Sequence, residues 1–305
     1  MRRVWSTIKH QLDASGVEYE AYETTARGDA TGKARASLRS GVESIVVVGG
    51  DGTLSEAAEG FFELHDDLDR LPTPINPSAT LSILPAGTGD DFARGLRGSR
   101  APLQTWIDKL VAHLRQENTQ TIDVLYGRCN GYEKPFICLN ASTMGIGGET
   151  AGRVAAQGKF MRKFSGEFRF VCAAVGALAA WRERRVIVTV DGRTIADGPM
   201  NLVGVANALY AGGGMMLSPE ARIDDGKLDV IMASGLSRAN VVTELSRIHT
   251  GGHVNNPKVT IVQGAIVRIE TLMLQDAMPL EADGNVRGVT PVQFQVLPGA
   301  LRFVV

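Results

Sequence analysis

The sequence predicts a fold in two parts, an open parallel α/β sheet followed by an antiparallel β-sandwich. Up to about residue 120, short apolar runs alternate with stretches of helical periodicity, as in a parallel sheet covered by helices. Beyond that point the chain becomes a series of short β-rich runs separated by Gly, Asn, Asp and Pro turns. We therefore expect an α/β domain over 1–125 and a sandwich domain over 126–305, with a helical insertion at about 148–181.

Composition limits the class of protein. The chain has 305 residues, 44% hydrophobic and 21% charged, which is enough for two ordered domains. A net charge of -1 argues against a nucleic-acid binder. Three cysteines are too few and too scattered for a metal site or a disulfide framework. With no signal peptide and no apolar run of spanning length, we expect a cytoplasmic protein, or one peripheral to the inner membrane face.

The individual elements follow from hydrophobic periodicity and from Gly and Pro punctuation. In chain order, the N-terminal half is predicted to contain a helix over 4–12, a strand over 17–25, a helix over 30–40, a strand over 45–48, a helix from 56 to about 64, a loop over 65–80 and a strand over 81–84. In the C-terminal half we expect strands at 122–126, 136–140, 185–190, 200–206, 227–232, 258–262, 266–270, 293–297 and 301–305.

A glycine-rich turn directly follows the predicted strand Ile45–Val48. The five positions Gly49–Thr53 contain three glycines, one aspartate and one threonine, and a predicted helix comes next. Glycines let backbone N–H groups approach an anion, and a helix N-terminus adds partial positive charge. Asp51 would repel a bare phosphate, so we expect it to act through Mg²⁺ or water. Taken alone, such a turn can equally be a tight connection that binds nothing.

A second cluster, Pro85–Arg94, follows the next predicted strand. It supplies two glycines, a hydroxyl, two carboxylates and an arginine at the start of a predicted helix. By itself it could be only a capped turn. Because ligands gather at the carboxyl ends of parallel strands, we expect the two turns to face each other across a crevice.

Gly49–Thr53 together with Pro85–Arg94 resembles the catalytic domain of diacylglycerol kinases, sphingosine kinases and bacterial lipid kinases. NAD kinases and phosphofructokinases share the first motif, whereas the second is more specific to the lipid kinases. Further segments that resemble the family follow in its order: Asn140–Gly147, Asn207 with Gly212–Gly214, Ser218–Asp229, Glu281–Gly284 and Leu297–Leu301.

The resemblance implies a nucleotide domain like that of NAD kinases and diacylglycerol kinases over a β-sandwich, with ATP and Mg²⁺ between them. Asp283 resembles the general base that takes the proton of the lipid hydroxyl, and Asp51 is the second catalytic candidate. Asp225, with the backbone carbonyls of Arg222 and Lys227, resembles a Mg²⁺ site. The implied nucleotide contacts are Thr24, Gly49, Gly50, Asp51, Gly52, Thr53, Leu54, Ser55, Gly87 and Thr88. Without the resemblance, an aspartate on a glycine turn is an ordinary turn residue.

The chain departs from the family pattern at three points. It starts at what resembles the helix after the family's opening strand and Asn-Pro-x-x-Gly loop. Asn285 stands where the family has glutamate after Asp-Gly, and Asp90 and Ser55 replace asparagines. At position 90 this exchanges an amide, which donates and accepts, for a carboxylate that only accepts.

These features predict an ATP- and Mg²⁺-dependent lipid kinase that phosphorylates a diacylglycerol-like hydroxyl in phospholipid metabolism. A soluble-metabolite kinase of the NAD kinase type and a non-catalytic nucleotide- or lipid-binding protein are the alternatives. Segment 153–185 has eight basic and two acidic residues, interleaved with aromatic ones, and such a segment can lie on an anionic membrane. The other interpretation of this segment is a helix pair packed on the sandwich with a solvated charged face.

Overall fold

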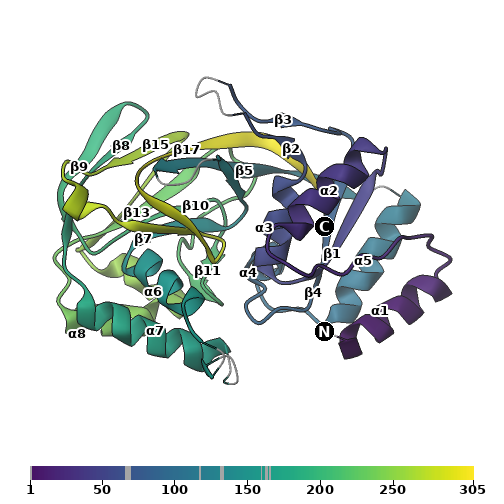
Figure 1. The fold of residues 1–305 in the computed structure, drawn as a ribbon, viewed down its shortest axis with the longest axis horizontal. Helices are drawn as coiled ribbons and strands as arrows, with labels where there is room; N and C mark the ends of the chain where they lie inside the picture. The colour runs from purple at the N-terminus through teal and green to yellow at the C-terminus, as the bar shows by residue number, and fades with distance from the viewer. Residues whose placement is uncertain are drawn as a thin grey trace.

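Two domains lie side by side in the computed structural model, which describes residues 2–65, 70–116, 118–130, 134–158, 160–161, 164 and 166–305 (Figure 1). The N-terminal half contains α1 (Arg2–Ala14), α2 (Asp29–Arg39), β1 (Ser44–Gly49), α3 (Asp51–Glu59), β2 (Phe62–Glu63), β3 (Thr73–Pro74), β4 (Thr80–Pro85), α4 (Asp91–Arg97) and α5 (Leu103–Gln116). The remaining strands are β5 (Thr119–Asn130), β6 (Phe136–Cys138), β7 (Ala141–Gly145), β8 (Arg184–Val190), β9 (Arg193–Met200), β10 (Leu202–Ala206), β11 (Tyr210–Ala211), β12 (Met215–Met216), β13 (Leu228–Ala233), β14 (Val259–Gly264), β15 (Ile266–Glu270), β16 (Pro279–Ala282) and β17 (Asn285–Val304). The remaining helices are α6 (Ile146–Ala155), α7 (Gly166–Ala180) and α8 (Arg238–Arg247), with short 3₁₀ turns η2 (Ile248–Thr250), η3 (Gly252–Asn255) and η4 (Leu274–Asp276).

The N-terminal sheet is parallel, as predicted. β1 pairs with β4 in register from Ser44 opposite Thr80 to Gly49 opposite Pro85. β4 also pairs in parallel with the end of β17, so the last strand of the chain extends this sheet. Helices α2 and α3 lie to one side of β1 and β4, and α5 with α1 to the other (Figure 1). The two strands therefore end at one edge, where the glycine turns follow.

The C-terminal strands form the predicted antiparallel sandwich. Hydrogen bonding runs in the order β14-β13-β10-β7-β16-β17-β15-β8-β9. Buried side chains from one arm of this order, such as Val188 and Ile269, share a core with Val205 and Val230 from the other arm. The sheet therefore folds over on itself around a shared apolar core.

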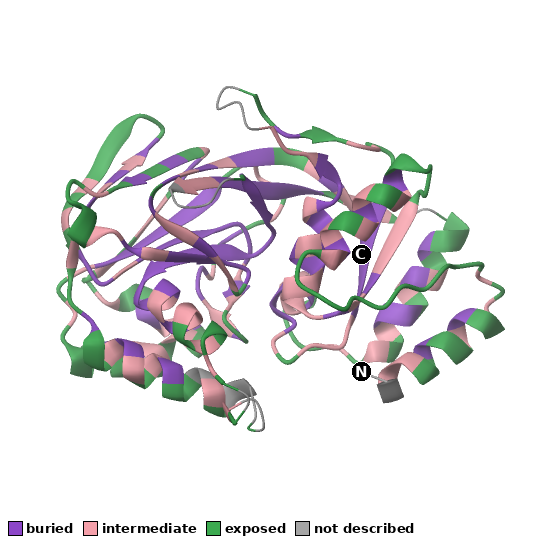
Figure 2. Ribbon diagram, viewed as in Figure 1, coloured by how far each residue is buried: buried purple, intermediate pink, exposed green. Residues whose placement is uncertain are grey.

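β5 and β17 connect the two domains. They pair antiparallel along most of their length, from Val289 opposite Asn130 to Val304 opposite Thr119. Within β17, Phe294 belongs to the sandwich core, whereas Phe303 belongs to the core of the N-terminal domain. Buried residues run through both strands where the domains meet (Figure 2). The boundary placed near residue 125 falls inside β5, and its position stays a prediction.

Two predictions for the N-terminal half are wrong. Residues 17–25 form no strand, because this segment pairs with no neighbouring strand and its Tyr19 and Tyr22 are exposed. The helix expected to reach residue 64 ends at Glu59, with Gly60 as its C-cap. Phe62–Glu63 instead pairs with Thr73–Pro74, which lies inside the predicted loop.

The C-terminal half differs from the prediction in continuity. The strands expected at 293–297 and 301–305 are parts of the single strand β17, because register shifts between Leu297 and Leu301 absorb the Pro-Gly turn signal. The helical insertion consists of two helices, α6 and α7. Helix α8 and strands β7, β9, β11, β12 and β16 were not predicted. None of the helices that the structure describes has the length and apolarity needed to cross a bilayer.

The attachment of β17 to the N-terminal domain can be tested with Phe303→Ala. The Phe303 ring is fully buried and packs edge-on against Phe92, with 5.0 Å between centroids. Its removal should lower the free energy of unfolding by about 3–5 kcal/mol through lost burial and an unfilled cavity. Urea unfolding measures this change. Leu114→Ala, at an exposed position of α5, is the control and should change it by less than about 1 kcal/mol. Equal effects would show that β17 does not anchor the domain.

Candidate functional site

The two glycine turns are in direct contact. β1 ends at Gly49, Gly50 is the extended N-cap, and α3 begins at Asp51. A Cβ atom built on Gly87 would lie 2.6 Å from the Cα of Gly50, too close for any side chain. The crevice expected between the two turns is therefore absent at this point, and Gly50 and Gly87 pack backbone against backbone.

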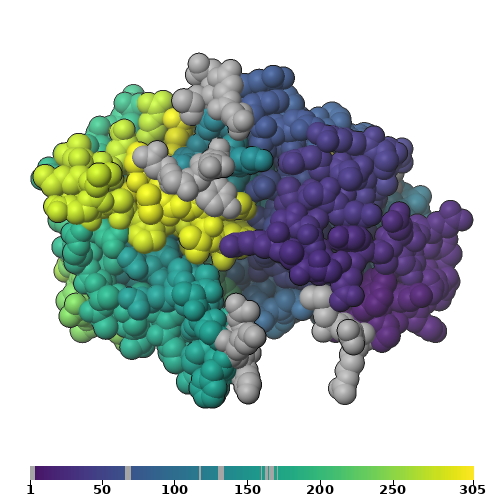
Figure 3. Space-filling view, in the orientation of Figure 1, coloured from purple at the N-terminus to yellow at the C-terminus, as the bar shows by residue number. Residues whose placement is uncertain are grey.

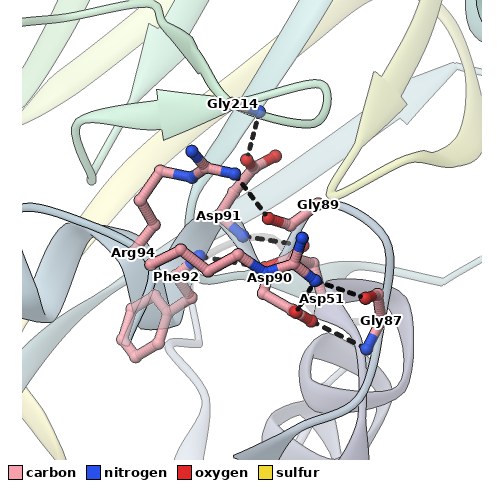
Figure 4. Close-up of polar contacts among 9 residues, drawn as sticks. Asp51, Gly87, Gly89, Asp90, Asp91, Phe92, Arg94 and Gly214 are labelled. Carbon is pink, nitrogen blue, oxygen red and sulfur yellow. Dashed lines mark hydrogen bonds and ion pairs between the residues drawn. The ribbon is translucent and has the colours of Figure 1, made fainter. Parts of the chain in front are cut away.

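Asp51 joins these turns through hydrogen bonds (Figure 4). Its carboxylate accepts the backbone N–H groups of Asp91 and Phe92, both at 2.9 Å, and these are the first residues of α4. The side-chain amide of Asn140 donates a third hydrogen bond at 3.3 Å. Both oxygens of Asp51 thus cap another helix. Its expected action through Mg²⁺ or water stays a prediction.

Asp90 fits its position through its backbone as well as its charge. It has φ 52°, a left-handed conformation that Asp and Asn adopt more readily than most residues. One oxygen accepts the N–H of Gly87 at 2.9 Å, and the other pairs with the guanidinium of Arg100 at 3.0 Å. Arg100 also donates to the Gly87 carbonyl. The carboxylate that replaces the family's amide is therefore compensated locally by an arginine.

Asp91 carries the contact across to the other domain. Its carboxylate accepts the backbone N–H groups of Gly213 and Gly214, at 2.7 and 2.6 Å (Figure 4). Burial, together with the neighbouring charge of Asp51, raises the pKa of Asp91 to about 6. Sequence reasoning noted this residue only as part of a cluster.

Asp283 lies on the turn between β16 and β17, with φ 46°. Its carboxylate accepts three backbone N–H groups, from Leu139, Asn140 and Ala141, at 2.8, 3.0 and 3.3 Å. Burial raises its pKa. The Cys138 thiol and the Ser55 hydroxyl also hydrogen-bond this carboxylate, so its roughly four acceptor positions are all used. Asn140 therefore contacts both predicted catalytic carboxylates. Its backbone N–H binds Asp283 and its side-chain amide binds Asp51.

Glu281 is a buried carboxylate that the sequence did not single out. It accepts the N–H and hydroxyl of Thr143, at 3.1 and 2.6 Å, and the N–H of Gly284 at 2.8 Å. Burial raises its pKa to about 7. The hydrogen bond that Glu281 accepts from Gly284 fixes the turn that carries Asp283. The sequence offered one signal for Glu281. It stands two residues before Asp283, and alternate residues of a strand lie on the same face.

Asn285 lies against the first glycine turn. A Cβ atom on Gly52 would be 3.9 Å from its Nδ2 atom. Its Oδ1 atom accepts a hydrogen bond from the Arg27 guanidinium at 2.6 Å, while the N–H of Gly28 donates to Glu56. Figure 3 shows the N-terminal segment, in purple, reaching the yellow C-terminal part of the chain. The neutral amide offers the Arg27 guanidinium no opposite charge, whereas a glutamate at position 285 would. Sequence reasoning missed Arg27.

The other predicted nucleotide contacts differ in exposure. Thr24 and Thr88 are exposed, on the N-terminal loop and the second glycine turn. Thr53 packs beside Gly49, since a Cβ atom there would lie 3.3 Å from its side chain. Leu54 and Ser55 are buried, and the Ser55 hydroxyl donates to the Ile137 carbonyl at 3.3 Å. The structure therefore leaves threonines, not the residues at 54–55, accessible to a ligand.

The predicted Mg²⁺ loop is held by a residue that was not predicted. Buried Asp123 of β5 accepts the N–H groups of Gly226 and Gly299, both at 2.7 Å. Asp225 accepts the N–H of Lys227 through one oxygen at 3.0 Å. Among the described residues, no three or more His, Cys, Asp or Glu side chains are grouped so that they could hold a metal ion.

The donor chemistry of this loop suits Mg²⁺. The Asp225 carboxylate and the carbonyls of Arg222 and Lys227 are hard oxygen ligands, which Mg²⁺ takes together with waters.

A cavity of about 210 Å³ adjoins the loop. It is lined by residues of α4, including Phe92 and Leu96, and by residues 208–209 and 221–224. A ligand in this cavity would touch both domains.

Comparison with known proteins gives a consistent family. Residues 1–126 match the diacylglycerol kinase catalytic domain, and residues 144–305 match the YegS C-terminal NAD kinase beta sandwich-like domain. A diacylglycerol kinase of Staphylococcus carnosus is 28% identical over 294 residues, covering 96% of this chain and 86% of that protein. A probable lipid kinase YegS-like of Xanthomonas axonopodis pv. citri is also 28% identical over 294 residues, covering 95% and 88%.

A solved structure shares the fold. The crystal structure of a putative diacylglycerol kinase from Bacillus anthracis str. Sterne has a TM-score of 0.71 to this chain at 23% identity. The match covers 98% of this chain and 90% of that one. The arrangement of an α/β domain beside a sandwich is therefore that of a known fold.

The contact between the glycine turns can be tested with Gly87→Ala. The added Cβ would meet the backbone of Gly50, which cannot move aside as a flexible side chain can. We expect a loss of about 1–3 kcal/mol in the free energy of unfolding, from overpacking. Gly32→Ala is the control, because a Cβ there meets nothing within 4 Å inside α2. That variant should gain about 0.5–1 kcal/mol. Urea unfolding distinguishes the two variants. A Gly87→Ala variant with the wild-type free energy of unfolding would contradict the contact between the two glycine turns.

The raised pKa of Glu281 predicts a pH-dependent stability. The folded protein holds this proton more tightly than the unfolded chain, whose glutamate has a pKa of 4.5. Its contribution is fully present below about pH 4.5 and is lost as the pH rises towards about 7, by at most about 3 kcal/mol. Between about pH 5 and pH 8, the free energy of unfolding measured in urea should fall less for Glu281→Gln than for the wild type. Glu270→Gln, at an exposed position of β15, should retain the wild-type slope. Identical slopes in all three proteins would show that Glu281 stays ionised.

Proposed function

Since this chain belongs to the diacylglycerol kinase catalytic-domain family and is a kinase, we propose that it transfers the γ-phosphate of ATP to the hydroxyl of a diacylglycerol-like lipid, with Mg²⁺. The observation that carries the proposal is the joint binding of Asp51 and Asp283 to Asn140. This links the glycine turn after β1 to an aspartate that is more than 200 residues away in the chain.

The glycine turn supports the nucleotide part of the proposal. Phosphoryl transfer needs chiefly positioning and charge neutralisation. Gly50 leads directly into α3, whose N-terminus carries partial positive charge suited to a phosphate. Asn285 lies against this turn and binds the guanidinium of Arg27. No described carboxylate lies within 4 Å of that guanidinium. An arginine in this position suits a phosphate oxygen.

Asp283 is the proposed base. Three backbone N–H groups hold its carboxylate in place, and the lipid hydroxyl would displace one of the two side-chain donors, Ser55 or Cys138. In the transfer, that hydroxyl oxygen bonds to the γ-phosphorus, the bond from phosphorus to the ADP oxygen breaks, and the proton passes to Asp283. Asp225 and the carbonyls of Arg222 and Lys227 would hold Mg²⁺, which supplies positive charge.

The proposal is tested by measuring phosphate transfer from labelled ATP to a panel of lipids in mixed micelles with Mg²⁺. Wild-type protein should label diacylglycerol, and Asp283→Asn should lower kcat by about 10²–10⁴-fold, the usual contribution of a positioned base. The matched control is Asp191→Asn. Asp191 also has positive φ, precedes a glycine and accepts two backbone N–H groups, but it lies on the β8–β9 turn.

The two variants separate chemistry from folding. Thermal unfolding should be similarly affected in both, because each loses acceptors for backbone donors. Activity should fall only in Asp283→Asn. Equal activities would exclude Asp283 as the base, and labelling of NAD instead of lipid would favour a soluble-metabolite kinase. If the wild type labels nothing, the enzyme assignment itself is wrong for these acceptors.

A further inference from the structure

Helix α7 is apolar on both its inner and its outer side. Ala173 and Ala177 are buried on the inner side of α7, which packs against α6. On the opposite side Phe168, Val171 and Val175 are exposed, and Val175 keeps 63% of its surface accessible. A surface helix normally presents polar residues to water on its outer side. Exposed apolar side chains on successive turns therefore indicate a face that another apolar surface covers.

The apolar stripe continues before the helix. Phe160 and Phe164 are both exposed, and their ring centroids lie 5.6 Å apart. Phe164 and Phe168 follow at 5.1 Å. The three rings form a row four residues apart, and Val171 and Val175 extend it by further steps of three and four residues.

A second exposed apolar group lies at the other end of α7. Leu272, Met273 and Leu274 are all exposed, and Leu274 keeps 96% of its surface accessible. They are tied to the end of α7 by Arg182, which pairs with Asp276 at 3.1 Å and donates to the Gln275 carbonyl. The sequence did not mark this group. It adds a second apolar projection beyond the C-terminal end of α7.

The charge of the segment determines which partner suits this surface. In sequence, 153–185 has eight basic and two acidic residues, a net charge of +6 from 8 − 2. Of these, Lys159, Arg162 and Lys163 lie outside the described residues. The described Arg182, Arg184 and Arg185 each pair with a carboxylate of the chain. The segment is therefore basic overall, while its described outer face is mainly apolar.

We propose that the α7 surface, defined as Phe160, Phe164, Phe168, Val171 and Val175 with the 272–274 projection, docks onto a membrane leaflet that contains anionic lipid. The proposal rests on the proposed function, because the acceptor lipid lies in such a leaflet. Apolar side chains would enter the boundary between headgroups and acyl chains, and the basic segment would attract anionic headgroups. A second copy of this chain is a poorer partner, because a two-fold interface would set two basic segments against each other.

Binding of the full chain to vesicles tests the proposal. Wild-type protein should cosediment with phosphatidylcholine vesicles that contain phosphatidylglycerol, and less with pure phosphatidylcholine. The variants Phe168→Ser/Val175→Ser and Leu272→Ser/Leu274→Ser should each lower the partition coefficient by about tenfold or more, as removed apolar area implies. Leu114→Ser, at an exposed apolar position of α5, is the control and should bind as the wild type. The four substituted positions of the two docking variants are exposed, so these variants should fold as the wild type does.

A kinase assay separates docking from catalysis. With a water-soluble short-chain diacylglycerol, the docking variants should keep the wild-type rate, and with vesicle-embedded diacylglycerol they should lose about tenfold. Vesicle binding by a wild type that phosphorylates no lipid would support docking while contradicting the proposed function. Variants that bind vesicles as tightly as the wild type would overturn the docking proposal. A wild-type dimer that these variants dissociate, measured by sedimentation velocity, would also overturn it, because the surface would then join two copies.

Discussion

The capping of α4 by Asp51 is the interaction on which the site depends. One carboxylate at the start of α3 binds the first N–H groups of α4 and the side chain of Asn140. Three segments distant in sequence are thereby fixed around the glycine turn. The arrangement is possible only because Gly50 and Gly87 lack side chains and their backbones can touch. Packing of glycines and capping by a carboxylate therefore support each other.

Buried carboxylates connect this centre to the C-terminal domain. Asp91, Glu281 and Asp283 each accept two or more hydrogen bonds, mostly from backbone N–H groups, and burial raises the pKa of each. Burying a carboxylate is unfavourable unless such donors surround it. Here the backbone donors offset that cost and hold the three carboxylates rigidly in place. The same groups link stability at this site to pH.

The β5–β17 pair holds the site in register. β17 contributes to both hydrophobic cores and carries Asp283 just before its first residue. Asp123 of β5 ties the predicted Mg²⁺ loop to the same pair of strands. The loop, the proposed base and the parallel sheet are thus fixed to one two-stranded ribbon. Beyond this ribbon, the exposed stripe on α7 remains available for a surface outside the chain.

The sequence by itself determined the order of domains, the parallel strands β1 and β4, most sandwich strands, and both glycine turns, because periodicity and glycine placement are local properties. It failed at residues 17–25, where alternation exists without a partner strand. Only the tertiary structure decided that Asp51 caps α4, that Arg27 meets Asn285, and that Glu281 and Asp123 are buried supports. These contacts join residues far apart in the chain, and the burial that shifts a pKa exists only after packing.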